Sequence, residues 1–278
     1  MTDTTDSADA SAETAEPGAS GPADKDKSRK QPRSKKRTAL REAAILVSIA
    51  MVFYYVVLTF MARPYLIPSE SMEPTLHGCP GCVGDRIMVD KLTYDFSSPR
   101  PGDVIVFEGP PSWNVGYKSI RSDNLPVRWI QNALSFVGFV PPDENDLVKR
   151  VIAVGGQTVQ CRADTGPTVD GKPLAEPYLD PETMRADPAV YRCLGNEFGP
   201  VTVPQGRLWV MGDNRNHSAD SRAHCASTPA DALKGVQCTG DPTFGTVPVD
   251  NVIGRARFIA WPPSRWGGVS SVNPQLGQ

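Results

Sequence analysis

Two serine side chains stand two residues apart in the stretch Ile67–Leu76, whose sequence is IPSESMEPTL. Pro68 and Pro74 bound the pair and keep the segment out of a helix, because each fixes its own φ and lacks a backbone donor. In an extended segment, residues i and i+2 share a face, so the hydroxyls of Ser69 and Ser71 can both reach the same bound group. One hydroxyl could attack a carbonyl carbon while the other donates to the oxygen that becomes negative. A serine pair alone is also typical of turns and solvated loops.

A candidate base lies in the run Asp146–Gly156, DLVKRVIAVGG, where two adjacent cations interrupt an apolar strand. Because neighbours on a strand point to opposite faces, we expect one of Lys149 and Arg150 to face inward and the other to reach solvent. Burial lowers the pKa of a lysine and can leave a neutral amine, which is a usable general base. The alternative is an edge strand whose cations both extend into water.

A third polar stretch, Met211–Arg222, has the sequence MGDNRNHSADSR and follows the apolar run Leu208–Met211. Its hydroxyls and its Asp/Arg pair could orient an amine and fix the shape of a loop beside a site. On its own the stretch also fits a calcium-binding loop, a sugar-binding loop or a simple turn.

An apolar run precedes all three stretches. Ala43–Ala62 is twenty residues without a charge, and a helix of that length spans about 30 Å, the hydrocarbon thickness of a bilayer. A basic run from Lys25 to Arg41 lies before it, and only Arg63 follows closely. The positive-inside rule then predicts one transmembrane helix at 43–62, with the N-terminus in the cytoplasm and everything after Arg63 outside. The alternative is a buried core helix.

The chain has 278 residues and a net charge of -2, which gives no global indication of a nucleic-acid partner. Residues 1–24 contain acids and small residues without one basic side chain, so we expect 1–42 to be a disordered cytoplasmic tail that ends in a basic juxtamembrane run.

The part after the anchor, 63–278, has the pattern of a mainly β protein. Short apolar runs alternate with turns rich in proline (27 in the chain) and glycine (24). The runs are Arg86–Asp90, Val104–Phe107, Leu147–Val154, Val201–Val203, Leu208–Met211 and Val252–Ala260.

Residues 109–146 interrupt this pattern with one helical signal behind possible caps at Asp123 and Asn124. The apolar residues at helical spacing are Trp129, Ile130, Ala133, Leu134 and Val137. We favour a short helix that packs on the domain over one that dips into the membrane interface. Trp261 and Trp266 allow the same two interpretations, interface or core.

Together with Pro101–Phe107 (PGDVIVF), the three polar stretches resemble the motif boxes of type I signal peptidase, a membrane-anchored Ser/Lys endopeptidase. The resemblance spans the anchor and most of the region after it. Pro101, Gln157 and His217 depart from residues that are usual in the family, and they affect turn geometry rather than the chemical groups.

The resemblance implies a role for each matching residue. Ser71 is the nucleophile and Lys149 the general base, while the Ser69 hydroxyl and the Ser71 amide form the oxyanion hole. Ser218 orients the Lys149 amine, and Asp220 pairs with Arg222 to support that loop. The substrate lies as an extended strand beside 64–71 and 146–149, and small residues before the cut fit pockets walled by Leu66, Ile67, Pro68 and Val148.

The resulting prediction is a mainly β protein with an antiparallel, barrel-like catalytic core on one transmembrane helix. The core takes 63–155 and 205–265, an inserted β-rich subdomain takes 156–204, and 266–278 is a C-terminal tail. The function is removal of N-terminal signal peptides from exported preproteins at the plasma membrane, after small residues of the A-x-A type. The catalytic domain lies on the extracytoplasmic side of a single-pass protein. No cofactor, metal or nucleic acid is expected; the partners are preproteins and the phospholipid bilayer.

Six cysteines all follow the predicted anchor, on the oxidising side, which favours disulfides. Sequence proximity suggests the pairs Cys79–Cys82, Cys161–Cys193 and Cys225–Cys238. Cys79 and Cys82 also form a C-x-x-C that could be a redox pair or half a zinc site. Two other functions therefore stay open, a membrane-tethered thiol-disulfide protein and a non-catalytic anchored binding module. A Ser/His mechanism is the alternative use of the three histidines, His77, His217 and His224. No serine lies in a G-x-S-x-G elbow, so we expect these histidines on the surface or in loops instead.

Overall fold

The structure is a computed structural model that describes residues 35–56, 62–79, 81–113, 122, 124–136, 146–180, 193 and 197–276. Most of the predicted tail, 1–34, lies outside these residues. The helical elements are α1 (Lys35–Val56), η2 (Glu70–Met72), α2 (Thr93–Phe96), η3 (Pro111–Trp113), α3 (Leu125–Phe136), α6 (Ser221–His224), α7 (Pro229–Ala232), η4 (Val249–Asn251) and η5 (Pro263–Arg265). The strands are β1 (Ala62–Leu66), β2 (Arg86–Asp90), β3 (Val104–Glu108), β4 (Asp146–Val154), β5 (Thr158–Arg162), β6 (Gly166–Val169), β7 (Lys172–Pro173), β8 (Phe198–Thr202), β9 (Arg207–Met211), β10 (Val247–Pro248), β11 (Val252–Trp261) and β12 (Gly267–Gly268).

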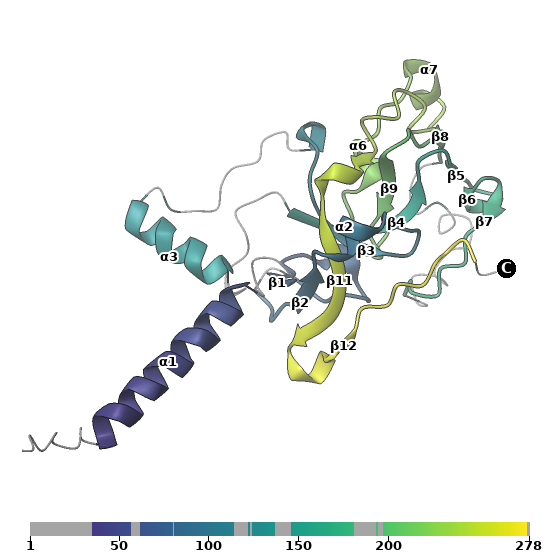
Figure 1. Cartoon of the computed structure of the whole chain (residues 1–278). Coiled ribbons are helices and arrows are strands. Elements are labelled where there is room, and N and C mark those ends of the chain that lie inside the picture. The colour runs from purple at the N-terminus through teal and green to yellow at the C-terminus, as the bar shows by residue number, and fades with distance from the viewer. Residues whose placement is uncertain are drawn as a thin grey trace, which may run out of the picture. The chain divides into compact units, whose positions relative to one another are not determined.

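The larger sheet has eight strands in the order β1-β2-β11-β3-β4-β9-β10, with β12 paired to β11. Its ladders are antiparallel, and the long strand β11 runs through its middle between β2 and β3 (Figure 1). The protein is therefore mainly β and antiparallel, as the sequence predicts. In this order β4 lies between β3 and β9.

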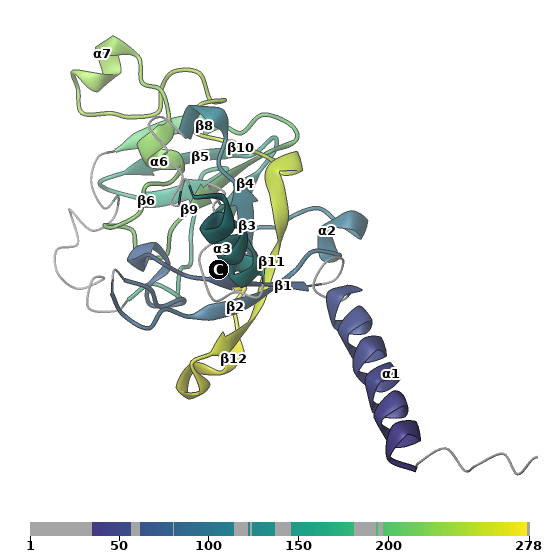
Figure 2. The same ribbon diagram turned by 90° about the vertical axis from the view of Figure 1, so that its left-hand side faces the viewer.

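A second sheet of four strands, in the order β7-β6-β5-β8, is built between β4 and β9 in the chain (Figure 2). It lies within the predicted subdomain at 156–204, whose status as a separate domain stays a prediction. Its core is continuous with that of the larger sheet, because one buried cluster contains both Val159 of β5 and Trp209 of β9.

The strands predicted from apolar runs are all present, with bounds that differ by three residues at most. Apolar periodicity did not reveal β1, β5, β6, β7, β10 or β12, which are short or carry prolines and polar residues. The strand β1, ARPYL, is set by pairing: Ala62 to Leu66 lie opposite Asp90 to Arg86 of β2.

The apolar helix α1 begins eight residues before the predicted anchor, because Lys35–Glu42 consists largely of good helix formers. It is described as far as Val56, and Ala62, which was expected inside the helix, opens β1. Its segment Thr38–Val56 has a mean hydropathy of 1.6, and none of it is buried. By length and composition it is the one described helix able to cross a membrane.

The helix predicted between 109 and 146 is present as α3, but the expectation that it packs on the domain is wrong. Its described large apolar side chains are exposed, and none of them belongs to the buried clusters, which strand residues dominate. The exposed fractions are Leu125 74%, Val127 43%, Trp129 78%, Ile130 59% and Leu134 40%. Val137 and the possible cap Asp123 lie outside the described residues.

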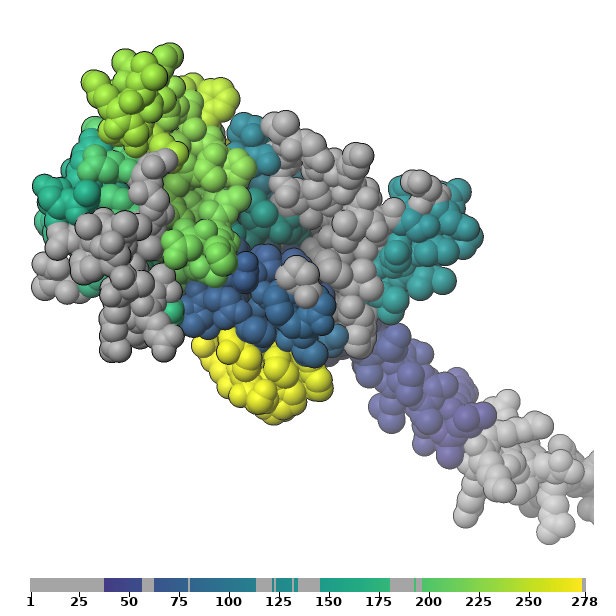
Figure 3. Space-filling view, turned by 180° about the vertical axis from the view of Figure 1, so that it is seen from behind, coloured from purple at the N-terminus to yellow at the C-terminus, as the bar shows by residue number. Residues whose placement is uncertain are grey.

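The C-terminal segment is not a free tail. Beyond β12, the Ser270 carbonyl accepts a hydrogen bond from Arg150 at 2.9 Å, and Pro274 accepts one from the Ala175 amide at 2.8 Å. The yellow C-terminal residues lie against the blue residues that include β2 (Figure 3), in accord with the β11–β2 pairing. Trp261 and Trp266 are 43% and 64% exposed, so neither is part of the core.

Candidate active site

Ser71 lies in η2, which follows shortly after β1, an edge strand of the larger sheet. It is 9% exposed. The Asn214 amide donates to the Ser71 carbonyl at 3.1 Å, which ties the serine backbone to the loop after β9. Gly212 makes this approach possible, because a Cβ at that position would stand 2.4 Å from the Ser71 carbonyl and 2.2 Å from Ser218 Oγ.

Lys149 reaches Ser71 from β4, and the two side chains are in direct contact. Its Nζ donates to Ser71 Oγ at 2.8 Å and to the Val148 carbonyl at 3.0 Å. The lysine is 3% exposed. Burial lowers the pKa of Lys149 to about 8, although Asp220 and Asp213 act in the opposite direction. A neutral amine is therefore accessible near physiological pH.

The expectation that one of the two adjacent cations reaches solvent is wrong, because Arg150 is also fully buried. It forms a two-pronged ion pair with Asp213, Nε to Oδ1 at 2.8 Å and Nη2 to Oδ2 at 2.7 Å. Nη1 also donates to the Gly102 carbonyl at 2.9 Å, and Tyr178 places its ring 3.9 Å from the guanidinium carbon. The alternation along β4 is as expected, but both of its faces are covered.

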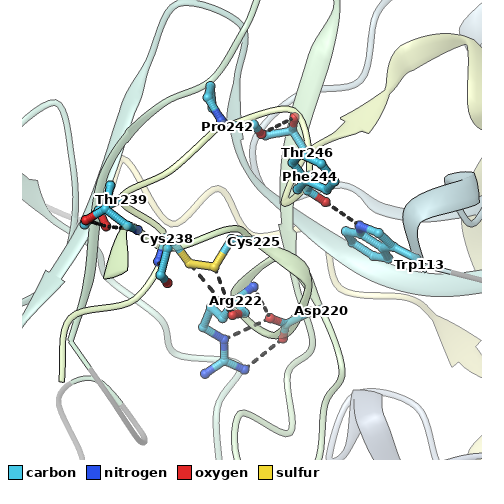
Figure 4. Close-up of a disulfide and its surroundings, with 11 residues drawn as sticks. Trp113, Asp220, Arg222, Cys225, Cys238, Thr239, Pro242, Phe244 and Thr246 are labelled. Atoms are coloured by element: carbon cyan, nitrogen blue, oxygen red, sulfur yellow. Dashed lines mark hydrogen bonds and ion pairs between the residues drawn. A yellow bond between two sulfur atoms is a disulfide. The ribbon is translucent and has the colours of Figure 1, made fainter. Parts of the chain in front are cut away.

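The Asp220–Arg222 pair is present in the loop after β9. Arg222 Nη2 lies 2.8 Å from Asp220 Oδ2, which also accepts from the Gly212 amide at 3.0 Å. Burial would raise the pKa of Asp220, but the guanidinium and these hydrogen bonds hold it below its ordinary value. The pair lies beside the Cys225–Cys238 disulfide, whose sulfurs are 3.2 and 3.8 Å from the Arg222 carbonyl oxygen (Figure 4).

The two other predicted serines lie near the Ser71–Lys149 contact. Ser69 Oγ is 3.4 Å from Ser71 Oγ, and Ser69 itself is exposed. Ser218 lies beside Gly212, but neither hydrogen bond of the Lys149 amine goes to Ser218 in the described part of the chain. The resemblance implies that Ser218 orients the Lys149 amine, but a hydrogen bond between the two is not among the contacts of that amine in the described residues.

The predicted pocket residues lie at the end of β1, in the segment between β1 and η2, and in β4. Leu66 ends β1 and is half-buried, Ile67 is 3% exposed, and Pro68 is exposed. Val148 is half-buried and packs against the cluster that contains Ile67. Their roles toward a substrate stay predictions.

Three residues to which the sequence assigned no role, Arg215, Glu176 and Tyr178, support the loop after β9. Arg215 forms a buried, two-pronged ion pair with Glu176, and Arg215 Nε donates to the Gly212 carbonyl at 3.1 Å. The Tyr178 hydroxyl donates to Glu176 at 3.0 Å. Arg215 was visible in the polar stretch, whereas Glu176 and Tyr178 are brought there only by the path of the chain after β7.

Glu176→Gln is expected to destabilise the protein by about 3–5 kcal/mol, because it leaves the buried Arg215 cation without its carboxylate. The matched control is Glu197→Gln, which breaks a 3.7 Å ion pair with Arg162 between half-exposed side chains and should cost about 1 kcal/mol or less. Denaturant unfolding of the full chain in detergent, followed by tryptophan fluorescence, measures both. Equal effects of the two substitutions would contradict a supporting role for Glu176.

The three disulfides suggested by sequence proximity are confirmed: Cys79–Cys82, Cys161–Cys193 and Cys225–Cys238. His77 lies close to the first, and its ligand atom and those of Cys79 and Cys82 fall within 4.8 Å of one another. The disulfide occupies both sulfurs, so they are not thiolate ligands while it is intact. His217 is exposed beside Glu70, and His224 stacks on Trp113 with ring centroids 4.4 Å apart.

A buried hydroxyl in hydrogen-bond contact with a buried amine whose pKa is lowered can act as a nucleophile and its general base. Such a pair is one of the arrangements that serine hydrolases use. A family model described as "Signal peptidase, peptidase S26" matches residues 40–261, so the chain belongs to the signal peptidase family. It is therefore a peptidase of that family.

Three curated relatives illustrate the similarity. The chain is 75% identical over 248 residues to signal peptidase I of Mycobacterium tuberculosis, covering 89% of this chain and 81% of that one. It is 77% identical over 244 residues to a probable signal peptidase I of Mycobacterium leprae, covering 88% and 84%. A probable signal peptidase I-1 of Synechocystis is 33% identical over 233 residues, covering 84% and 88%.

Proposed function

We propose that this chain is a membrane-anchored serine endopeptidase that removes N-terminal signal peptides from exported preproteins with a Ser71/Lys149 dyad. The observation that carries the proposal is the 2.8 Å contact between Lys149 Nζ and Ser71 Oγ, two buried groups on separate elements. The signal peptidases among its relatives support the substrate class.

In the proposed mechanism, neutral Lys149 takes the proton of Ser71 as its oxygen attacks the scissile carbonyl carbon. The C–O bond to the serine forms, and the carbonyl oxygen becomes negative. The lysine then returns its proton to the leaving amine as the C–N bond breaks. A water, activated by the same amine, hydrolyses the acyl-enzyme and releases Ser71.

The Ser71 amide and the Ser69 hydroxyl are the proposed donors to the oxyanion. Each such donor is typically worth about 3–4 kcal/mol in the transition state. Asp220 accepts a hydrogen bond from the Gly212 amide and Ser218 packs against Gly212, while Asp220 and Arg222 also act on the pKa of Lys149. Through these contacts the loop positions the serine, and through its charges it influences the proton affinity of the base.

The substrate is proposed to bind as an added strand between the segments 64–71 and 146–149. Two observations support this mode. On the β9 side, the ladder of β4 begins only at Arg150, so Leu147 to Lys149 have no strand there among the described residues. The other segment begins in β1, which ends the strand order of its sheet. Strand addition supplies backbone hydrogen bonds, while Leu66, Ile67, Pro68 and Val148 wall the pockets for small side chains.

The anchor is proposed to be α1, a single span with the N-terminus in the cytoplasm and the catalytic domain outside the plasma membrane. The basic residues before it and the hydropathy of Thr38–Val56 support this orientation. Three disulfides after the span fit an oxidising compartment. Preproteins and the bilayer are then its partners.

Cleavage of a peptide with one A-x-A site by the full chain in detergent tests this function, with the product termini identified by mass. Cutting directly after the second alanine is expected, and alkylating any free thiols beforehand should leave the rate unchanged. A matched peptide with bulky residues at the two small positions should stay intact. No cleavage would contradict the proposal, and so would loss of cleavage on alkylation, which would indicate a thiol rather than Ser71 as the nucleophile.

The pH dependence of kcat/KM should report the titration of Lys149. Its folded pKa is lowered to about 8, and only the neutral amine can accept a proton, so activity should fall as pH drops through that value. At pH 7 about a tenth of the enzyme would carry the neutral amine, and the rate should fall about tenfold with each further unit. Steady-state cleavage of the A-x-A peptide measures the profile, and a rate independent of pH between about 6 and 9 would contradict it.

A further inference from the structure

A long excursion leaves the larger sheet close to the candidate dyad. The strands β3 and β4 pair side by side as far as Glu108 opposite Asp146, a geometry that a turn of about two to five residues could close. The chain instead inserts residues 109–145 between them. Asp146, where the excursion rejoins the sheet, stands three residues before Lys149.

The first part of this excursion is fixed to the domain. Trp113 in η3 is buried, and its Nε1 donates to the Phe244 carbonyl at 2.8 Å (Figure 4). Its ring stacks on His224. The helix α3 follows, and its described side chains are mostly exposed.

The helix α3 is amphipathic by sequence and exposed in the structure. Leu125, Trp129, Ile130 and Leu134 recur at helical spacing and are between 40% and 78% exposed. The polar residues recur at the complementary positions, Arg128, Gln131, Asn132 and Ser135. An apolar surface of this kind on a short helix calls for a partner of matching chemistry.

The width of the apolar surface favours lipid over a protein groove. At 100° per residue the apolar positions run from Leu125 through Ile130 to Val127, an arc of about 200°. A helix–helix seam needs a narrower stripe, whereas a helix partly immersed in lipid contacts it over a wide arc. Twelve residues make only about 18 Å, too short to span a bilayer, so the helix would lie in the interface plane.

The charge around α3 fits an anionic surface. Residues 114–136 contain Lys118, Arg121 and Arg128 against the single acid Asp123, and the acids Asp143 and Glu144 come only after the helix. Basic residues are drawn to anionic headgroups, and tryptophan is enriched at the headgroup level.

We infer that α3 is an interfacial helix that docks the rim of the active site onto the bilayer surface through Leu125, Trp129, Ile130 and Leu134. The inference rests on the proposed membrane anchoring, which keeps the lipid surface at a high effective concentration. Docking would restrain the open end of the β3–β4 hairpin near the headgroups, where a membrane-bound substrate presents its cleavage site.

The test uses the full chain reconstituted in vesicles that contain anionic lipid. The variant Trp129→Glu/Ile130→Glu places two charges on the proposed lipid face. The matched control, Phe96→Glu/Leu233→Glu, changes two apolar residues outside α3 that are 88% and 91% exposed. We expect the α3 variant to cleave a vesicle-bound preprotein about tenfold more slowly than the wild type, and a soluble A-x-A peptide at a rate within about twofold of it. The control should match the wild type on both substrates.

A direct readout is independent of catalysis. The fluorescence lost in Trp129→Phe isolates the Trp129 signal, which lipids with a quencher near the headgroup should reduce in vesicles. Aqueous iodide should quench this signal less in the vesicles than in the full chain held in detergent. Unchanged iodide quenching without lipid quenching would overturn the inference. An equal loss of cleavage rate on both substrates in the α3 variant would also overturn it. So would a wild-type protein that self-associates and that the α3 variant dissociates, because a second copy of the chain would then cover the apolar face of α3. If the proposed function itself were wrong, the wild type would fail to cut the soluble peptide while lipid quenching of Trp129 could still be measured.

Discussion

Ser71→Ala is expected to lower kcat/KM for an A-x-A peptide by roughly 10,000-fold or more while the protein stays folded. The substitution removes the oxygen that Lys149 Nζ contacts at 2.8 Å. The neighbouring Ser69 hydroxyl, 3.4 Å from that oxygen, is not among the hydrogen-bond partners of the Lys149 amine in the described residues. Because only one buried oxygen is deleted, the thermal unfolding midpoint should change little. Cleavage followed by chromatography at high enzyme concentration covers the range needed.

The matched control for this prediction is Ser98→Ala, which removes the same atom from an exposed loop serine. It should cleave at the wild-type rate. Ser69→Ala should give an intermediate loss of about 100- to 1,000-fold, the usual effect of removing one oxyanion donor. Retained cleavage in Ser71→Ala would contradict the assignment of the nucleophile.

Lys149→Met is expected to lower kcat by about 100- to 10,000-fold, the range that a general base contributes. Methionine keeps an unbranched chain of similar length in the buried space but has no group to accept the proton. Lys149→Arg distinguishes two explanations, because a guanidinium is always protonated. It should fail as a base, whereas it would restore activity if only a positive charge were needed at this position.

The two substitutions should also be coupled. If the serine and the lysine act as one unit, Ser71→Ala/Lys149→Met should be no slower than the slower single variant. Losses that simply multiply would show that the two residues act independently, which would contradict a dyad.

The local chemistry was predictable from sequence because motif and strand pattern coincide there. Ser71 follows a proline-bounded segment, and Lys149 interrupts an apolar run that is indeed a strand of the larger sheet. Their contact at 2.8 Å needs β4 and η2 to meet across a separation of 78 residues. Periodicity alone says nothing about such a pairing, and only the resemblance to a family supplied it.

Where the sequence misled, the cause lies in the surroundings of each residue. Alternation along β4 correctly separates Lys149 from Arg150, but it does not reveal that Asp213 and the Tyr178 ring cover the arginine. Tertiary partners therefore made both cations buried. The helical spacing in α3 was correct, yet an amphipathic pattern does not say whether its apolar face meets protein or lipid.

Supporting contacts between distant segments were not predictable at all. Glu176 and Arg215 are 39 residues apart, with β8 and β9 between them in the chain, and no spacing rule connects them. The bounds of α1 were also missed in part, because its helix-forming basic residues extend it upstream while pairing with β2 takes Ala62 into a strand.

The rate at which an acylating inhibitor of serine hydrolases adds mass to Ser71 tests most directly whether Lys149 activates that oxygen. Intact mass spectrometry of the full chain, with peptide mapping of the adduct, would follow wild type and Lys149→Met at about pH 9, where the amine is mostly neutral. We predict a single adduct on Ser71 in the wild type and almost none in Lys149→Met over the same time. An adduct that forms on Ser71 equally fast without the amine, or on another residue, would contradict the proposed proton transfer.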